Sequence, residues 1–128
     1  MVQMNNDFKE DKIVEPIKIS VYSLVGSSHC ILAADGEKVY KKIKEALDRN
    51  KRVELSFLNV ELLTSAFLNA AIGKLYGDFS AEKIRKSLFL RSISAEDREL
   101  IKRVVSMAKM YYKDPELLAK AIKEFLRK

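Results

Sequence analysis

One segment of this 128-residue chain limits the fold more than any other, because residues 64–76 are apolar around most of a helix's circumference. Thr64 or Ser65 supplies a side chain of the kind that caps the start of a helix. A helix that is apolar on nearly all sides must be covered on nearly all sides, so we expect it to be packed deeply. Its apolar residues are Phe67, Leu68, Ala70, Ala71, Ile72 and Leu75.

Short strand patterns alternate with helix patterns on either side of this segment. The first two strands are separated by Gly26-Ser27-Ser28, which predicts a β-hairpin. The later strands are separated by helices, which favours parallel pairing. We therefore expect an α/β fold with a mixed, mostly parallel sheet of about four strands and helices packed on it. The predicted strands are residues 17–25, 29–33, 52–57 and 87–90, and the predicted helices begin at Asp35, Thr64 or Ser65, Ser80, Ser94 and Asp114.

Length and composition indicate one domain. Residues 1–16 are polar, acidic on balance and closed by Pro16, so we predict an N-terminal arm there and a single domain over residues 17–128. The last predicted helix is amphipathic, with Leu118, Ile122 and Phe125 on one face. That face could bind a partner or cover one side of the sheet, and we favour the second.

The scarcity of histidine and cysteine excludes several kinds of chemistry. His29 is the only histidine and Cys30 the only cysteine, so disulfides and His- or Cys-based zinc sites are excluded. Neighbours on a strand point to opposite faces, which argues against a Cys-His dyad. We expect no enzyme activity, no metal and no cofactor. A small enzyme acting through Ser27, Ser28 or His29 is the weakest alternative.

Positive charge is concentrated in the C-terminal third of the chain. Residues 1–80 hold 11 Lys/Arg and 11 Asp/Glu, whereas residues 81–128 hold 13 and 7, so all of the net +6 comes from there. The alternative function is therefore a nucleic-acid-associated accessory protein that uses this basic third. Tyr111-Tyr112 could stack on a base, but a helix end packed on the sheet is the simpler interpretation. A solvated helical face is the simpler explanation of the charge, and we favour it over a nucleic-acid site.

Location follows from the absence of targeting signals. The N-terminus has no apolar run of signal-peptide length, and the apolar stretch 62–75 falls short of the about 20 residues that span a membrane. Together with a lone thiol, this predicts a cytoplasmic protein without a membrane partner.

The strand and helix over residues 52–76, and the later Leu88-Phe89-Leu90 and Ser94-Ala95-Glu96-Asp97, resemble the STAS-like family of unknown function. The resemblance runs from about Gly36 to Tyr112. The family is similar to the STAS domains of anti-sigma factor antagonists and of sulfate transporter tails. It implies a non-catalytic regulatory module that binds a protein partner, such as a serine-kinase-like ATPase.

The resemblance also implies a site. Antagonists are switched by phosphorylation of a serine at the start of the helix after the third strand, within an Asp-Ser-Ser-Gly motif. That motif aligns with Thr64-Ser65-Ala66-Phe67, so the acceptor position holds Ala66, which cannot be phosphorylated. Thr64 and Ser65 remain as acceptors in a shifted register, or simply as helix caps, which we favour. The candidate partner-binding residues are Thr64, Ser65, Ala66 and Asn69.

Overall fold

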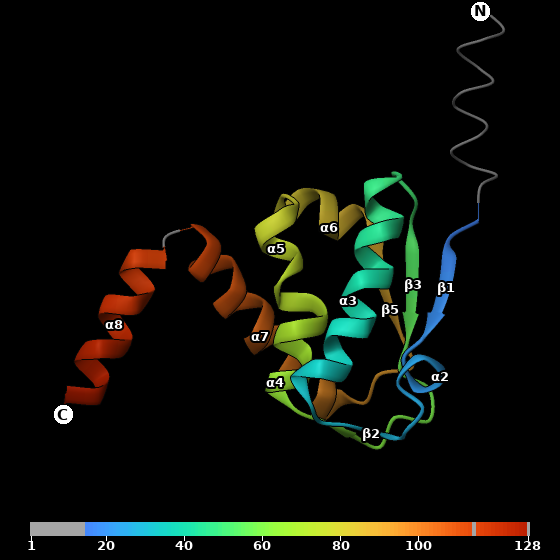
Figure 1. Ribbon diagram of the computed structural model, residues 1–128, viewed down its shortest axis with the longest axis horizontal. Helices are drawn as coiled ribbons and strands as arrows, with labels where there is room; N and C mark the ends of the chain where they lie inside the picture. The colour runs from blue at the N-terminus through green and yellow to red at the C-terminus, as the bar shows by residue number, and fades with distance from the viewer. Residues whose placement is uncertain (1–14, 114, 128) are drawn as a thin grey trace, which may run out of the picture.

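The computed structural model describes residues 15–113 and 115–127 and has the predicted α/β class (Figure 1). Most of the predicted arm, residues 1–14, lies outside the described part of the chain. The elements in chain order are β1 (Ile17–Ser20), α2 (Val21–Val25), β2 (His29–Cys30), α3 (Ala33–Asp48), β3 (Val53–Ser56), β4 (Leu62–Leu63), α4 (Ser65–Leu68), η1 (Asn69–Gly73), α5 (Leu75–Asp78), α6 (Ala81–Ser87), β5 (Leu88–Arg91), α7 (Ala95–Lys113) and α8 (Pro115–Arg127).

The main sheet has three parallel strands in the order β1-β3-β5. Val53 and Leu55 of the middle strand are fully buried, and the alternate residues Glu54 and Ser56 are partly exposed. On that second face Glu54 forms an ion pair of 3.4 Å with Arg91 of β5. The alternation follows the two-residue period of a strand, so one face carries the core and the other is polar. Helices α3, α4, α5 and α7 lie on one side of the sheet in Figure 1.

The predicted β-hairpin is wrong. The first strand ends at Ser20, whose hydroxyl accepts a hydrogen bond of 3.1 Å from the Ser23 amide and so caps α2. Gly26 ends this one-turn helix with a φ of 81°. The second strand pairs with β4, not with β1, and this pairing is also parallel. The mostly parallel character holds, with three strands in one sheet and two in another.

Helix α3 starts earlier than expected. It begins at Ala33, and Asp35, which we predicted as the cap, lies in its first turn. A carboxylate there still interacts favourably with the amide end of the helix. The predicted apolar stripe is confirmed, because Val39, Ile43 and Leu47 are fully buried.

The central helix, defined as the run α4–η1–α5 over residues 65–78, is buried as predicted. It packs against α3 on one side and α7 on the other. A π-helical turn at η1 interrupts it, and Gly77 lies inside its last turn and does not end it. A Cβ atom added at Gly77 would lie 2.6 Å from the Tyr112 ring, so glycine allows that ring to approach.

The C-terminal helices differ in how they pack. Ser94 caps α7 as predicted, since its hydroxyl accepts from the Asp97 amide at 3.1 Å. Helix α8 contacts mainly α7 and projects from the body of the molecule, so our expectation that it covers the sheet is wrong (Figure 1). Ile122 of α8 is 46% exposed. The side chains of Leu118 and Phe125 lie outside the described residues.

Candidate functional site

The start of the central helix is fastened by Thr64. Its hydroxyl accepts a hydrogen bond of 3.1 Å from the Phe67 amide, which makes Thr64 the N-cap of α4. The same hydroxyl donates a hydrogen bond of 2.6 Å to the Ile31 carbonyl, just beyond β2. Of the two caps the sequence allowed, the structure uses Thr64. Ser65 is the first residue of the helix and is exposed.

The β2–β4 pairing holds the segment that leads into this cap. His29 lies opposite Leu62 and Cys30 opposite Leu63 in the parallel register. The Thr64 amide donates to the Cys30 carbonyl at 3.2 Å, which extends the pairing to the helix itself. The helix start is therefore set by two segments far apart in the sequence.

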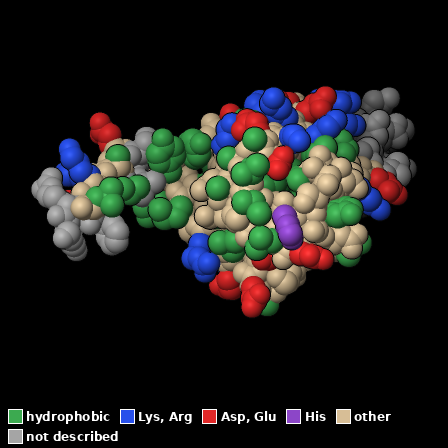
Figure 2. Space-filling model, turned by 60° about the horizontal axis from the view of Figure 1, so that its bottom comes forward, with side chains coloured by type: hydrophobic (Ala, Val, Ile, Leu, Met, Phe, Trp, Pro, Cys, Tyr) green, Lys and Arg blue, Asp and Glu red, His purple; other side chains and the backbone are tan. Residues whose placement is uncertain are grey.

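An apolar surface surrounds this start. We name it the loop patch and define it as Ile31, Leu32, Leu58 and Leu62, which are 39%, 61%, 61% and 45% exposed. These residues lie in the loops beyond β2 and β3 and in β4, near the carboxyl ends of the strands. Figure 2 shows hydrophobic side chains gathered on this face beside the histidine. In parallel sheets the carboxyl ends of the strands are the usual place for binding sites.

The structure brings the four candidate residues together on one side of the central helix. Asn69 lies three to four residues after Ala66 and Ser65, one turn further along the helix, and all three are exposed, whereas Thr64 is half-buried. Ser65 and Asn69 border a shallow hollow against α7, whose far wall includes Arg103. The sequence identified this helix start but not the wall opposite it.

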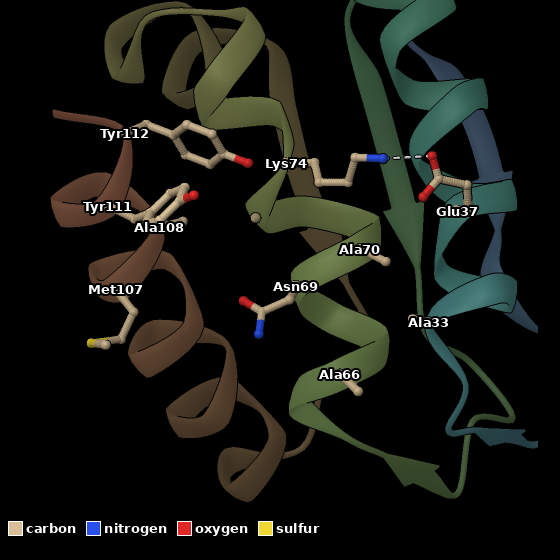
Figure 3. A pocket seen from close by; sticks show the side chains of 11 residues that line it. Ala33, Glu37, Ala66, Asn69, Ala70, Lys74, Met107, Ala108, Tyr111 and Tyr112 are labelled. Carbon is tan, nitrogen blue, oxygen red and sulfur yellow. Dashed lines mark hydrogen bonds and ion pairs between the residues drawn. The ribbon is translucent and has the colours of Figure 1, made fainter. Parts of the chain in front are cut away.

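A groove of about 520 Å³ continues from Ala66 along the central helix. Figure 3 shows its floor on the central helix and its two walls on α3 and α7. The groove exists because the floor is made of small residues spaced one helical turn apart, and this spacing is the signal in the sequence that could have revealed it. The floor residues are Ala66, Ala70 and Gly73, and the walls include Ala33, Glu37, Met107, Ala108, Tyr111 and Tyr112.

A charged cluster closes the end of the groove. Lys74 donates to Glu37 at 2.6 Å and lies over the Tyr40 ring, 4.5 Å from its centroid. The Tyr40 hydroxyl donates to Asp78, and burial together with this carboxylate raises the pKa of Tyr40 well above its usual range. Tyr40 is therefore protonated at neutral pH. The cluster ties α3 to the central helix and leaves no unpaired charge among these four side chains.

The π turn η1 lies directly under the groove. It covers Asn69–Gly73, and π turns inside α-helices occur frequently at functional sites. The Asn69 side chain points toward α7 (Figure 3) and makes no hydrogen bond to a described residue. Its amide is therefore available to a ligand or partner from the groove.

The alternative catalytic residues do not form a catalytic arrangement. The Ser27 hydroxyl accepts from the main-chain amide of His29 at 3.0 Å, which is a turn contact. His29 is exposed, whereas Cys30 is fully buried, as expected for neighbours on a strand. Burial, reinforced by Asp35, raises the pKa of the Cys30 thiol. A thiol in that state is a poor nucleophile at neutral pH.

Part of the basic charge of residues 81–128 is paired. Lys86 pairs with Glu82 at 3.1 Å, Lys102 with Glu99 at 3.5 Å, and Arg91 with Glu54. Tyr111 and Tyr112 are not packed on the sheet as expected. They are 45% and 42% exposed and meet edge to face in the groove wall, with centroids 4.9 Å apart.

Two further features are absent from the described residues. None of the helices over residues 15–113 and 115–127 is both long and apolar enough to cross a membrane. Within the same ranges, no three His, Cys, Asp or Glu side chains converge on a point where they could hold a metal ion.

Comparison with known proteins agrees with the resemblance seen in the sequence. A family model described as a STAS-like domain of unknown function (DUF4325) matches residues 35–98, half of the chain. The match runs from the first turn of α3 to the first turn of α7 and includes β3, the Thr64 cap and the central helix. Searches of curated proteins and of solved structures found no match. The chain therefore belongs to the STAS-like family of unknown function.

Proposed function

We propose that this chain is a non-catalytic regulatory module that binds a protein partner through the loop patch and the start of α4. The observation that carries the proposal is the exposure of four large apolar side chains around one helix start, with Leu32 and Leu58 both 61% exposed. Single exposed apolar residues are ordinary, but a group of them on one face marks an interaction site. Ser65, Ala66 and Asn69 form the polar and small border of that face.

The relation to STAS antagonists supports a serine-kinase-like ATPase as the partner class. The corresponding helix start in antagonists faces such an enzyme, and here the same element lies beside the loop patch. Regulation differs, because Ala66 occupies the acceptor position. The Thr64 hydroxyl already makes two hydrogen bonds, so a phosphate on it would remove the donor and disturb the cap. We therefore propose constitutive binding without a phosphorylation switch.

The test is retention of the partner by tagged protein in lysate of its own cells, with identification by mass spectrometry. Leu58→Asp and Leu62→Asp place a charge within the interface, which must be desolvated on binding, so we expect each to reduce the retained partner at least about tenfold. Ile17→Asp is the matched control, because Ile17 is also an exposed apolar residue, at the opposite end of β1. All three variants should keep the far-UV circular dichroism of the native protein.

Two results would count against the proposal. One is a partner that both loop-patch variants still retain but that the Ile17→Asp variant does not. The other is steady ATP or ester hydrolysis by the purified protein that disappears in His29→Ala, because that would make the chain an enzyme.

A further inference from the structure

Two apolar side chains of helix α8 that the structure describes are left exposed by their own chain. Ile122 and Leu126 are 46% and 74% exposed, and α8 packs mainly against α7. Figure 1 shows it extending away from the sheet and the central helix. An amphipathic helix usually buries its apolar face against another element.

The groove on the central helix matches α8 in length. Together with the adjoining hollow, it follows α7 from Leu100 to Tyr112, roughly 18 Å at the rise of an α-helix. Helix α8 has 13 residues, about 20 Å. The alanine and glycine floor lets another helix approach closely, as packed helices with interaxial distances of about 8–10 Å require.

The short connection to α7 disfavours placing α8 in the groove of its own chain. To lie over the central helix beside α7, α8 would have to run antiparallel to α7 and against it. Two antiparallel helices are joined by loops of about 2–5 residues. Only Asp114 stands between the last residue of α7 and Pro115, the first of α8.

We propose that α8 of a second copy of this chain occupies the groove, and that the exchange is reciprocal. Exchange of one identical element between two copies gives a closed dimer with twofold symmetry. The charges are compatible, since the groove border carries Glu37, Lys74 and Arg103 and the polar side of α8 carries both signs. A membrane surface fits less well: residues 115–127 hold three cations and two carboxylates, whereas surface-bound helices are rich in Lys and Arg.

The proposal predicts a dimer that depends on both halves of the contact. We would measure the mass of the full chain by light scattering after size exclusion, over a range of concentrations. Ile122→Glu damages α8 and Met107→Glu damages the groove wall; each should weaken dimerisation roughly 30-fold or more, because both contacts of the dimer lose a central apolar residue. Lys120→Glu is the control, since it puts the same carboxylate on the polar side of α8 and should leave the dimer intact.

Mixing the two damaging variants separates this arrangement from simple α8–α8 packing. The mixed pair keeps one intact contact, between α8 of the Met107→Glu chain and the groove of the Ile122→Glu chain. Differently tagged variants should therefore co-elute when mixed, although each is monomeric alone. If α8 helices paired with each other, the Met107→Glu chain would still dimerise alone and would not co-elute with the Ile122→Glu chain, and the proposal would be overturned.

Two other outcomes would also overturn it. The first is a native chain that stays monomeric up to about 100 μM, too weak an association for a working dimer. The second is sedimentation of the monomer with phosphatidylserine vesicles that Ile122→Glu abolishes. This inference goes beyond the proposed partner binding and fails separately from it, because the Ile122→Glu substitution leaves the loop patch unchanged.

Discussion

The hydroxyl of Thr64 donates a hydrogen bond of 2.6 Å to the main-chain carbonyl of Ile31. The same oxygen accepts a hydrogen bond from the Phe67 amide, so one small side chain both caps α4 and ties it to the end of β2. Ile31 belongs to the loop patch, and the helix start provides the patch's small and polar border. This contact therefore sets how the two parts of the proposed interface lie relative to each other.

Thr64→Ala should lower the free energy of unfolding by about 1–2 kcal/mol, because it removes the cap and leaves the Phe67 amide without its partner. Thr64→Ser keeps the hydroxyl and should retain most of that stability. Ser65→Ala should be nearly neutral, since Ser65 is exposed and its hydroxyl bonds to no described residue. Urea unfolding at equilibrium measures all three. Equal losses at Thr64 and Ser65 would contradict this assignment of the cap.

Gly36→Ala should destabilise the protein, although alanine is ordinarily better than glycine inside a helix by about 1 kcal/mol. A Cβ atom at this position would overlap the Phe67 carbonyl oxygen and come within 2.9 Å of the Ala70 Cβ. The central helix crosses α3 there with almost no space between the backbones. The two helices must move apart, at a net cost of about 2 kcal/mol or more.

The matched control is Lys41→Ala, an exposed position on the same helix, which should change stability by less than about 0.5 kcal/mol. Thermal and urea unfolding of the two variants would be compared. A Gly36→Ala variant as stable as the native chain would show that α3 and the central helix can separate at little cost.

The sequence predicted the elements whose pattern reflects local rules and burial. The alternation in β3, the stripe on α3 and the apolar central helix were all confirmed, because each can be predicted from the hydrophobic pattern of one continuous segment. Residues 21–25 were assigned to a strand because they continue the period-2 alternation that starts at Ile17. The helical signals were present, with Ser20 as a cap and Gly26 as a terminator, and they outweighed this alternation. In such a short segment, the capping residues determine whether a helix or a strand forms.

Pairing between distant segments could not be predicted in the same way. Nothing in His29-Cys30 distinguishes Leu62-Leu63 as a partner from β1, which is nearer in sequence. Only one part of the candidate site could be predicted from the sequence. The helix start was identified through the family resemblance. Met107 and Tyr111 line the groove because α7 packs beside the central helix, and the residue pattern within a single helix does not predict which helices pack together.

Cys30 should make the protein less stable at alkaline pH. Burial raises the pKa of its thiol above 9.0, so the folded state keeps a proton that the unfolded state loses first. The stability that this group contributes is complete below the unfolded pKa and is lost as pH rises through and above it. Between pH 8 and pH 10, the free energy of unfolding should fall more steeply in the native chain than in Cys30→Ala.

Labelling with iodoacetamide gives an independent check on Cys30. The native thiol is fully buried and should react far more slowly than the same thiol in urea. Rapid stoichiometric labelling of the folded protein at pH 7.5 would mean that Cys30 is accessible and that the β2–β4 pairing opens readily.

Ser65→Asp tests the absence of a phosphorylation switch. The residue is the first of α4, where a carboxylate interacts favourably with the free amides of the helix, so the fold should tolerate the change with unaltered or slightly increased thermal stability. Retention of the protein partner should fall, because a charge beside the loop patch must be desolvated on binding. Ser65→Asn is the control, similar in size and uncharged, and should retain the partner. Since we propose that the chain is not phosphorylated here, its intact mass after purification from its own cells should equal the sequence mass. A stoichiometric phosphate on Thr64 or Ser65 would instead mean that the antagonist switch operates in this chain from a shifted position.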